Sequence, residues 1–310
     1  MKNIVLIGGG TGMPSLLRGL KKHECELTAV VNVTDSGRSS GKIREEMGIL
    51  PPGDIRNCIA ALSESESVVR EVFQYRFENG DSLGNLMIAA LSDIFGSFES
   101  AIEEVGKILN IKGMVLPVTL KNVHLCAELQ DGEIRVKEHN VRGIGKAKIN
   151  KVYLDKKAYA NPVVLEAIKG ADLIVLGPGS LYTSIISNLL VDGVADAIVK
   201  SKAKKVYVCN IMTQAGQTDD FTSSTHVSEL VTYLGADCLD YVLVNSNNFS
   251  DVLLENYRKE SASPVVDDLN RPGLIRGDFV EMGSQNQVFW HKQNLLWHDS
   301  KKIAEAIMKL

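Results

Sequence analysis

Short apolar runs alternate with helical patterns along this chain, and this alternation constrains its fold more than any other feature. The runs typical of strands lie at 3–7, 27–33, 172–176, 205–211 and 241–245. Strands joined through helices lie parallel, because each helix carries the chain back to the edge of the sheet where the next strand starts. The sequence therefore predicts an α/β fold, with a Rossmann-like, mainly parallel sheet and helices on both faces.

Two stretches depart from this alternation. Between about 55 and 110 the pattern is helical, and an Asp-Ser cap signal precedes the helical run Leu83–Phe95. From about 113 to 145 the apolar period approaches two, with the turn signal Asp131-Gly132 inside it. We expect a helical insertion and a small antiparallel β-hairpin flap, both within one domain that spans residues 1–310.

The first candidate site is a glycine turn between a strand and a helix. The turn, residues 8–12, follows the first strand-like run and precedes a helical pattern from Pro14 to Lys21. Backbone N–H groups and a helix N-terminus then point at an anion. Met13 stands where the dinucleotide fingerprint has its third glycine, which weakens an NAD-dependent dehydrogenase as an interpretation. The candidate phosphate-binding residues of this turn are Gly9, Gly10, Thr11 and Gly12.

A polar loop follows the second strand-like run. Residues 32–41 combine hydroxyls, glycines and an acid, and the segment 51–57 adds a second acid and an amide. Open α/β folds bind ligands at the carboxyl edge of the sheet, where serine hydroxyls can donate hydrogen bonds to phosphate oxygens. Asp35 and Asp54 are suited to hold Mg²⁺ or a ribose hydroxyl. The candidate ligand-binding residues here are Asp35, Ser36, Gly37, Ser39, Ser40, Asp54 and Asn57.

A second glycine turn, residues 177–180, follows the strand-like run at 172–176 and repeats the first arrangement. Either turn alone is equally well explained as a tight connection, but the two turns and the polar loop together favour a ligand site. Further polar groups occur in the glycine-containing segment 80–86 and after the strand-like run at 205–211. No catalytic residue is identified. The candidates added here are Asn85, Gly177, Gly179, Ser180 and Thr213, with Tyr182, Tyr257 and Arg258 as weaker contacts to a base or sugar.

Composition narrows the classes of function. Lys plus Arg number 34 against 38 for Asp plus Glu, a net charge of −4 without long runs of one sign, which disfavours nucleic acid as a partner. No apolar segment approaches the roughly 20 residues that span a bilayer, and the N-terminus lacks a signal-peptide pattern, so we expect a cytoplasmic protein. The five cysteines and six histidines show no zinc-site spacing. Mg²⁺ is the one cofactor that the residues suggest.

Five motifs in order resemble one superfamily, which joins the bacterial gluconeogenesis factors (YvcK-like) to the 2-phospho-L-lactate transferases (CofD-like). The resemblance covers essentially the whole chain, and it implies a Rossmann-like core with a phosphate-bearing ligand in a cleft over the carboxyl edge of the sheet. The motifs are Gly8-Gly-Gly-Thr-Gly12, Asn32-Val-Thr-Asp-Ser-Gly37, Pro51-Pro-Gly-Asp-Ile-Arg-Asn57, Gly80-Asp-Ser-Leu-Gly-Asn-Leu86 and Gly177-Pro-Gly-Ser-Leu-Tyr-Thr-Ser184.

The motif at 80–86 and the compact length resemble the gluconeogenesis-factor branch. That branch implies a regulator of cell shape and envelope synthesis during gluconeogenic growth. It also implies binding of UDP-sugars such as UDP-N-acetylglucosamine, an envelope-synthesis protein as partner, and a homodimer. The other branch implies the alternative, a Mg²⁺-dependent transfer of a phospholactyl-type group from a nucleotide diphosphate donor.

One position departs from the pattern of the gluconeogenesis factors. Their polar loop commonly has a second glycine where this chain has Arg38, between Gly37 and Ser39. A guanidinium here either adds a phosphate contact or points to solvent. If the position requires a positive φ, arginine is strained there.

Overall fold

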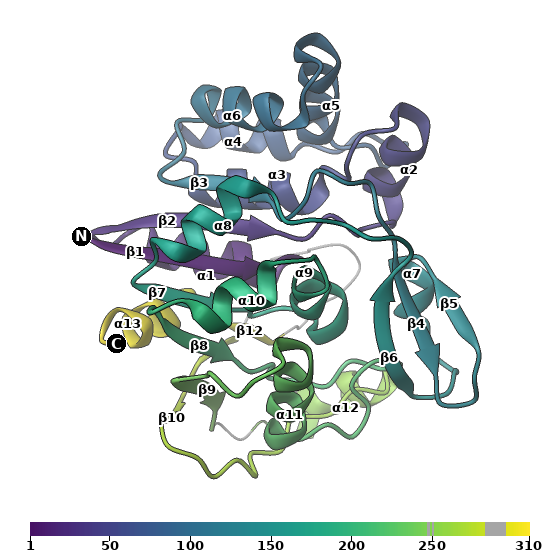
Figure 1. Cartoon of the computed structure of the whole chain (residues 1–310), viewed down its shortest axis with the longest axis vertical. Coiled ribbons are helices and arrows are strands. Elements are labelled where there is room, and N and C mark those ends of the chain that lie inside the picture. The colour runs from purple at the N-terminus through teal and green to yellow at the C-terminus, as the bar shows by residue number, and fades with distance from the viewer. Residues whose placement is uncertain (247–248, 250, 283–295) are drawn as a thin grey trace.

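A parallel sheet forms the centre of the molecule in the computed structural model, which describes residues 1–246, 249, 251–282 and 296–310. Its order is β10-β9-β8-β7-β1-β2-β3, with every neighbouring pair parallel (Figure 1). This confirms the predicted α/β class and Rossmann-like sheet. The strands are β1 (Lys2–Gly8), β2 (Cys25–Val31), β3 (Met114–Pro117), β7 (Leu173–Leu176), β8 (Lys204–Val208), β9 (Tyr241–Asn245) and β10 (Leu274–Gly277).

Alternate residues of the central strand β1 build two cores. Ile4 and Leu6 belong to one buried apolar cluster, whereas Val5 and Ile7 belong to another on the opposite face. A strand apolar on both faces needs cover on both sides, and helices supply it. The first cluster includes residues of α1 (Gly12–Leu20), α3 (Gly53–Leu62) and α13 (Ser300–Met308), and the second includes residues of α8 (Pro162–Lys169), α10 (Val194–Lys200) and α11 (Ser223–Leu234).

A helical segment lies between β2 and β3, at the top of Figure 1, and it begins with α2 (Arg38–Met47), earlier than the expected insertion at about 55–110. Two of its helices begin at serine caps, because Ser82 Oγ accepts the N–H of Asn85 and Ser97 Oγ accepts the N–H of Ser100. The helices of this segment are α2, α3, α4 (Ser67–Gln74), α5 (Leu83–Phe95) and α6 (Phe98–Ile108).

The small antiparallel sheet is present, with three strands in the order β5-β4-β6. Its boundaries differ from the expected 113–145. Residues 114–117 form β3 and pair with β2 in the large sheet, and a third strand follows residue 145. A short apolar run at the edge of a parallel sheet has the same local pattern as a hairpin strand. The sequence therefore does not distinguish an edge strand of the large sheet from a strand of the small one. The elements are β4 (Leu125–Leu129), β5 (Ile134–Val136), α7 (Glu138–Val141) and β6 (Ile149–Leu154).

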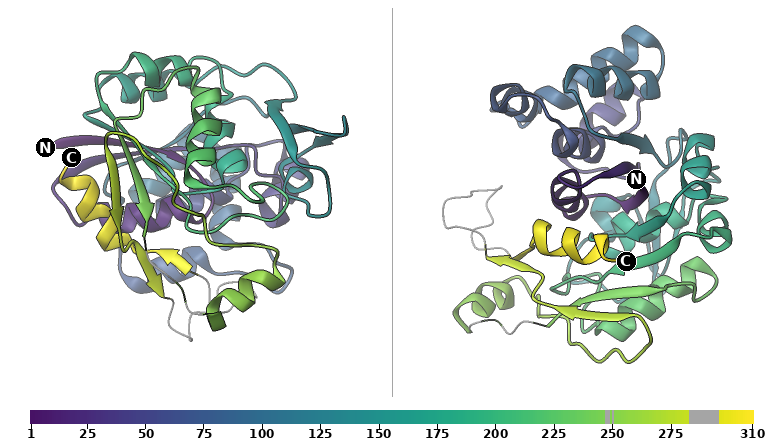
Figure 2. Two further views of the ribbon diagram at one scale, coloured as in Figure 1. Left: turned by 90° about the horizontal axis from the view of Figure 1, so that it is seen from below. Right: turned by 90° about the vertical axis from the view of Figure 1, so that its left-hand side faces the viewer.

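The C-terminal part returns to the first strand. Asp299 caps α13 by accepting the N–H groups of Lys301 and Lys302, and Lys2 Nζ donates to the carbonyl of Met308 at 3.0 Å. The two termini therefore lie close together (Figure 2). The remaining elements are the π-helix η1 (Leu181–Ile186), α9 (Ser187–Leu189), α12 (Asp251–Lys259), β11 (Val280–Met282) and β12 (Leu296–His298).

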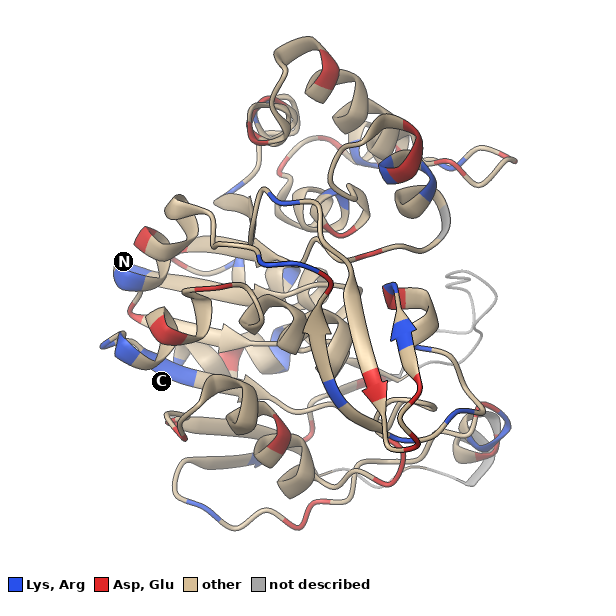
Figure 3. Ribbon diagram, turned by 45° about the vertical axis from the view of Figure 1, so that its right-hand side comes forward, with Lys and Arg blue, Asp and Glu red and all other residues tan. Residues whose placement is uncertain are grey.

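Charges of both signs are interspersed over the helices, strands and loops (Figure 3). Within the described ranges, none of the helices has the length and apolar character needed to cross a membrane.

Candidate functional site at the sheet edge

The order of the strands locates a crevice at the carboxyl edge of the sheet. From β1 the chain proceeds to β2 and β3 on one side, and from β7 it proceeds to β8 and β9 on the other side. The direction of winding therefore reverses between the neighbours β1 and β7, and ligands of open α/β sheets bind at such a point. The two glycine turns, residues 8–12 and 177–180, follow these two strands.

The two turns approach each other closely. A Cβ atom on Gly12 would lie 2.5 Å from the carbonyl oxygen of Pro178, and one on Gly179 would lie 3.4 Å from the carbonyl oxygen of Gly9. Gly10 has φ +66°, which side chains other than glycine rarely adopt. Glycine is therefore required both for the conformation of the first turn and for its contact with the second.

Asp54 contacts the backbone of the first glycine turn. It occupies the first turn of α3, and its Oδ2 accepts the backbone N–H of Gly10 at 2.7 Å. Loss of solvation, followed by the negative charge of Asp35, raises the pKa of Asp54 from 3.8 to about 7, although the bond from Gly10 opposes the rise. Near neutral pH this carboxyl group can therefore give up or take up a proton.

The polar loop after β2 meets the N-terminus of α3. Asp35 Oδ1 accepts the N–H of Gly37 at 2.9 Å, and a Cβ on Gly53 would lie 3.4 Å from Asp35 Oδ2 and closer still to Ser40 Oγ. Asn32 ties the loop to η1, the π-helix that follows the second turn, because its Nδ2 donates to the carbonyl of Thr183 at 2.9 Å. The structure thus brings both predicted acids and both glycine turns to one place.

Comparison with known proteins agrees with these motifs. Residues 4–279 match the family model described as 2-phospho-L-lactate transferase CofD. The chain is 43% identical to the gluconeogenesis factor of Halalkalibacterium halodurans, covering 99% of this chain and 96% of the relative. It is 41% identical to the gluconeogenesis factor of Bacillus subtilis, covering 99% and 97%. The chain belongs to the CofD family, in its gluconeogenesis-factor branch.

A solved structure supports the same assignment. An X-ray crystal structure of a protein from Bacillus halodurans matches with a TM-score of 0.93 at 43% identity, and the match covers 99% of both chains. At this level of similarity the whole fold is shared, including the small antiparallel sheet. The predicted membership of the gluconeogenesis-factor family is therefore confirmed.

Two of the predicted serines bond to neighbouring helices. Ser36 Oγ lies 3.0 Å from His139 Nδ1 and accepts the N–H of His139 at 3.3 Å, which fastens α7 to the polar loop. Ser39 Oγ donates to Asp81 Oδ1 at 3.1 Å and accepts a bond from Asn85 Nδ2 at 3.4 Å. In this gluconeogenesis-factor chain these hydroxyls therefore connect the loop to α7 and α5.

Two amides of the predicted set differ in their bonding. Asn57 Oδ1 accepts a bond from the Arg56 guanidinium at 2.7 Å. Asn85 is buried, and its Oδ1 has no hydrogen-bond partner within the described part of the chain. Asn85 Oδ1 therefore stays without a partner, whereas Asn57 Oδ1 already accepts one bond.

Charged groups missed by the sequence analysis complete the surroundings of the two acids. Glu138 of α7 is buried; burial raises its pKa, Arg142 at 3.2 Å opposes the rise, and the charge of Asp35 adds to it. Arg44 is also buried and donates to the carbonyl of Asp35 at 3.2 Å and to Asn122 Oδ1 at 2.7 Å. Asp35 lies 103 residues before Glu138, and Asn122 lies 78 residues after Arg44, so no local pattern marks either residue as part of the site.

Several predicted contacts lie elsewhere or are occupied. Thr213 exchanges hydrogen bonds with Ser263, Tyr182 is buried against Glu229, Tyr257 Oη accepts the N–H of Leu296, and Arg258 pairs with Glu255 at 3.3 Å. Thr11 keeps an exposed side chain and Ser180 a partly exposed one. The roles of these residues in ligand binding stay predictions.

Arg38 is the first residue of α2, so its backbone is helical and the strain expected for a positive φ does not arise. Its side chain lies outside the described part of the structure.

The fit of Mg²⁺ rests on the two neighbouring aspartates. Among the described residues, no group of three or more His, Cys, Asp or Glu side chains is arranged to hold a metal ion. Mg²⁺ commonly binds through one or two carboxylates together with substrate phosphates and water. Asp35 and Asp54 fit that limited role, since a cation between them would offset the repulsion by Asp35 that, after burial, raises the pKa of Asp54. Bound there, the ion would neutralise charge on a diphosphate.

Proposed function

We propose that this chain is a cytoplasmic regulator that binds a nucleotide sugar, with UDP-N-acetylglucosamine as the first candidate, without converting it. The observation that carries the proposal is the meeting of two glycine turns where the winding of the sheet reverses, between β1 and β7. Turns of this kind place backbone N–H groups against phosphate oxygens. The identity of the ligand rests on membership of the gluconeogenesis-factor branch.

The residues around the turns suit both the diphosphate and the sugar or ribose of such a ligand. The diphosphate lies against residues 9–12 and 177–180, with the exposed Thr11 hydroxyl as a further donor. Asp35 is partly exposed and accepts hydroxyl groups of the sugar or ribose. Asp54 supports the first turn through Gly10 and does not have to touch the ligand.

The contact between Ser36 and α7 offers a route by which ligand binding at the glycine turns is transmitted to another part of the protein. It joins the polar loop to the small antiparallel sheet, so a ligand that moves the loop also moves α7. A protein partner that recognises the position of α7 would connect the concentration of the ligand to cell shape and envelope synthesis during gluconeogenic growth. The partner and a homodimeric state are parts of the proposal drawn from the family.

Calorimetric titration with UDP-N-acetylglucosamine tests the proposal. Asp35→Asn keeps a side-chain acceptor for Gly37 but removes the charge, and Asp93→Asn, at an exposed position of α5, is the matched control. We expect binding by the wild type and the control and at least tenfold weaker binding by Asp35→Asn. Absence of binding to this and other UDP-sugars by folded protein rejects the proposal.

The pair Asp35 and Asp54 favours a second candidate function, Mg²⁺-dependent transfer from a nucleotide diphosphate donor. It predicts new products when donor, acceptor and Mg²⁺ are incubated together, and mass spectrometry detects them. Products that require Mg²⁺ and disappear in Asp35→Asn would establish the transferase. If the nucleotide binds but the donor is not chemically converted, the transferase is rejected and the regulator remains the proposed function.

A further inference from the structure

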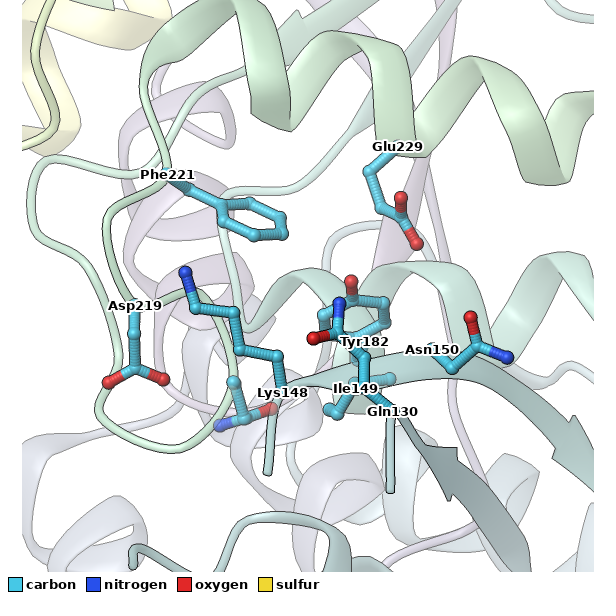
Figure 4. Close-up of a pocket in the computed structure, with 9 residues that line it drawn as sticks. Gln130, Lys148, Ile149, Asn150, Tyr182, Asp219, Phe221 and Glu229 are labelled. Carbon is cyan, nitrogen blue, oxygen red and sulfur yellow. The ribbon is translucent and has the colours of Figure 1, made fainter. Parts of the chain in front are cut away.

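A second cavity lies between the small antiparallel sheet and the large core, with a volume of about 250 Å³ (Figure 4). Five parts of the chain supply its walls: the end of β4, the start of β6, the π-helix η1, the loop at 217–221, and α11. None of its lining residues belongs to the glycine turns or the polar loop, although Tyr182, one of the predicted sugar contacts, follows the second turn by two residues. It is therefore a separate candidate site.

The deep part of this cavity combines two aromatic rings with a carboxyl group. Tyr182 and Phe221 have ring centroids 6.4 Å apart at 66°. The Tyr182 hydroxyl and Glu229 share a hydrogen bond, and burial raises the pKa of both groups. Figure 4 shows the Glu229 carboxyl group and the Tyr182 hydroxyl directed toward one another. An aromatic surface beside a hydrogen-bonding group is suited to a ring with an apolar face and polar edges.

An unpartnered polar atom points independently to a ligand. Gln217 lines the cavity and is only 6% exposed. Its Nε2 donates to Gln214 Oε1 at 3.4 Å, but its Oε1 has no partner among the described residues. Buried acceptors are nearly always paired, and leaving one unpaired is destabilising. A hydroxyl donor in the cavity would satisfy it.

The rim of the cavity is polar and carries both donors and acceptors. Gln130 and Asn150 present exposed amides, and Lys148 is paired with Asp220 at 3.2 Å. Figure 4 shows Gln130 and Asn150 on the side of the cavity formed by the small sheet. Hydroxyl groups both donate and accept, so they match a lining of amides, a carboxyl group and an ammonium group.

Charge and size exclude larger and anionic ligands. Asp219 and Glu229 line the cavity against the single cation Lys148, so an anion would be repelled. Drug-sized ligands occupy pockets of about 300–1,000 Å³, and this cavity is smaller. We propose that the cavity binds a small neutral polyhydroxylated molecule of monosaccharide size. The assignment does not depend on nucleotide-sugar binding at the glycine turns.

Saturation-transfer NMR with the free sugars D-glucose and N-acetyl-D-glucosamine tests this site, with glucose 6-phosphate as the anionic comparison. Gln217→Leu removes the unpartnered acceptor, and Glu229→Gln preserves shape while removing the acid. Asp35→Asn, at the glycine-turn site, is the control. Circular dichroism confirms that each variant is folded.

We expect transfer to a neutral sugar by the wild type and Asp35→Asn, at least tenfold weaker binding in a folded cavity variant, and weaker binding of glucose 6-phosphate. The assignment is overturned if neither neutral sugar receives saturation, or if binding is unchanged in the folded cavity variants. It is also overturned if binding disappears in Asp35→Asn, because the sugar would then occupy the glycine-turn site. If UDP-sugar binding is absent but neutral sugars still bind the cavity, the assignment of the cavity stands.

Discussion

The backbone N–H of Gly10 donates to Asp54 Oδ2 at 2.7 Å, and this bond joins the first glycine turn to the N-terminus of α3. The bond engages only one of the two carboxylate oxygens of Asp54, so a metal ion would meet the other oxygen. Asp35 Oδ1 likewise accepts a backbone N–H, that of Gly37 at 2.9 Å, within the polar loop. Asp54 therefore joins two segments that are distant in sequence, whereas Asp35 holds its own loop, although their motifs look equivalent in the sequence.

Gly12→Ala should separate the two glycine turns. Its Cβ would lie 2.5 Å from the carbonyl oxygen of Pro178, a backbone atom that cannot move alone. Overpacking of this kind typically costs about 1–3 kcal/mol, and we expect a lower free energy of unfolding together with loss of UDP-sugar binding. Gly170→Ala is the control, since its nearest neighbour would be 3.5 Å away. Equal stability of the two variants in urea would contradict the close contact.

Asp54→Asn should change how stability depends on pH. The pKa of Asp54 is raised to about 7 in the folded state, so between pH 4 and 7 the folded state binds more protons than the unfolded state. Its contribution to stability therefore falls as pH rises through this window, by at most about 1.4 kcal/mol per pH unit. Asparagine keeps an acceptor for Gly10 and does not titrate.

His298 contributes an opposite slope, because burial lowers its pKa to about 4. The measurement is therefore the difference between wild type and Asp54→Asn in urea unfolding at pH 5 and pH 8. We expect the variant to gain stability relative to wild type at the higher pH. A difference that stays constant between the two pH values would show that Asp54 ionises normally.

Local sequence signals account for much of the fold. The serine caps of α5 and α6 act within three residues, so they are readable from the sequence, as is the Asp131-Gly132 turn. That β1 and β7 become neighbours cannot be read from the sequence, because the paired residues Ile4 and Leu173 lie 169 positions apart. Each glycine turn could be recognised in the sequence, but the contact between the two turns depends on the order of the strands in the sheet.

The candidate site was only partly predictable for a related reason. Ser36 and Ser39 belong to the predicted loop, yet their hydroxyls face α7 and α5, because side-chain direction depends on which elements pack alongside. Arg44 reaches an amide 78 residues away at Asn122. Asn188 likewise donates to the carbonyl of Gly8 at 3.0 Å across 180 residues. Such partners become apparent only in the folded chain.

Ser36→Ala should loosen α7 without unfolding the protein. The substitution removes the hydroxyl that lies 3.0 Å from His139 Nδ1 and accepts the His139 N–H. A net loss of about 1 kcal/mol is typical for such bonds, so hydrogen exchange should accelerate several-fold at residues 138–142. Ser228→Ala, at an exposed position of α11, is the control. Faster exchange in both variants, or in neither, would argue against a specific tie between the loop and α7.

Mg²⁺ should stabilise the protein only when a nucleotide diphosphate is present. Asp35 and Asp54 supply two carboxylates, too few to hold the ion tightly, and phosphate oxygens would complete its coordination. A ligand that binds only the folded state raises stability by about 2.7 kcal/mol at 100 times its Kd. Thermal unfolding with UDP should therefore show a rise in Tm on adding Mg²⁺ that EDTA reverses. Asp35→Asn should abolish the rise, and an equal rise without UDP would place the ion elsewhere.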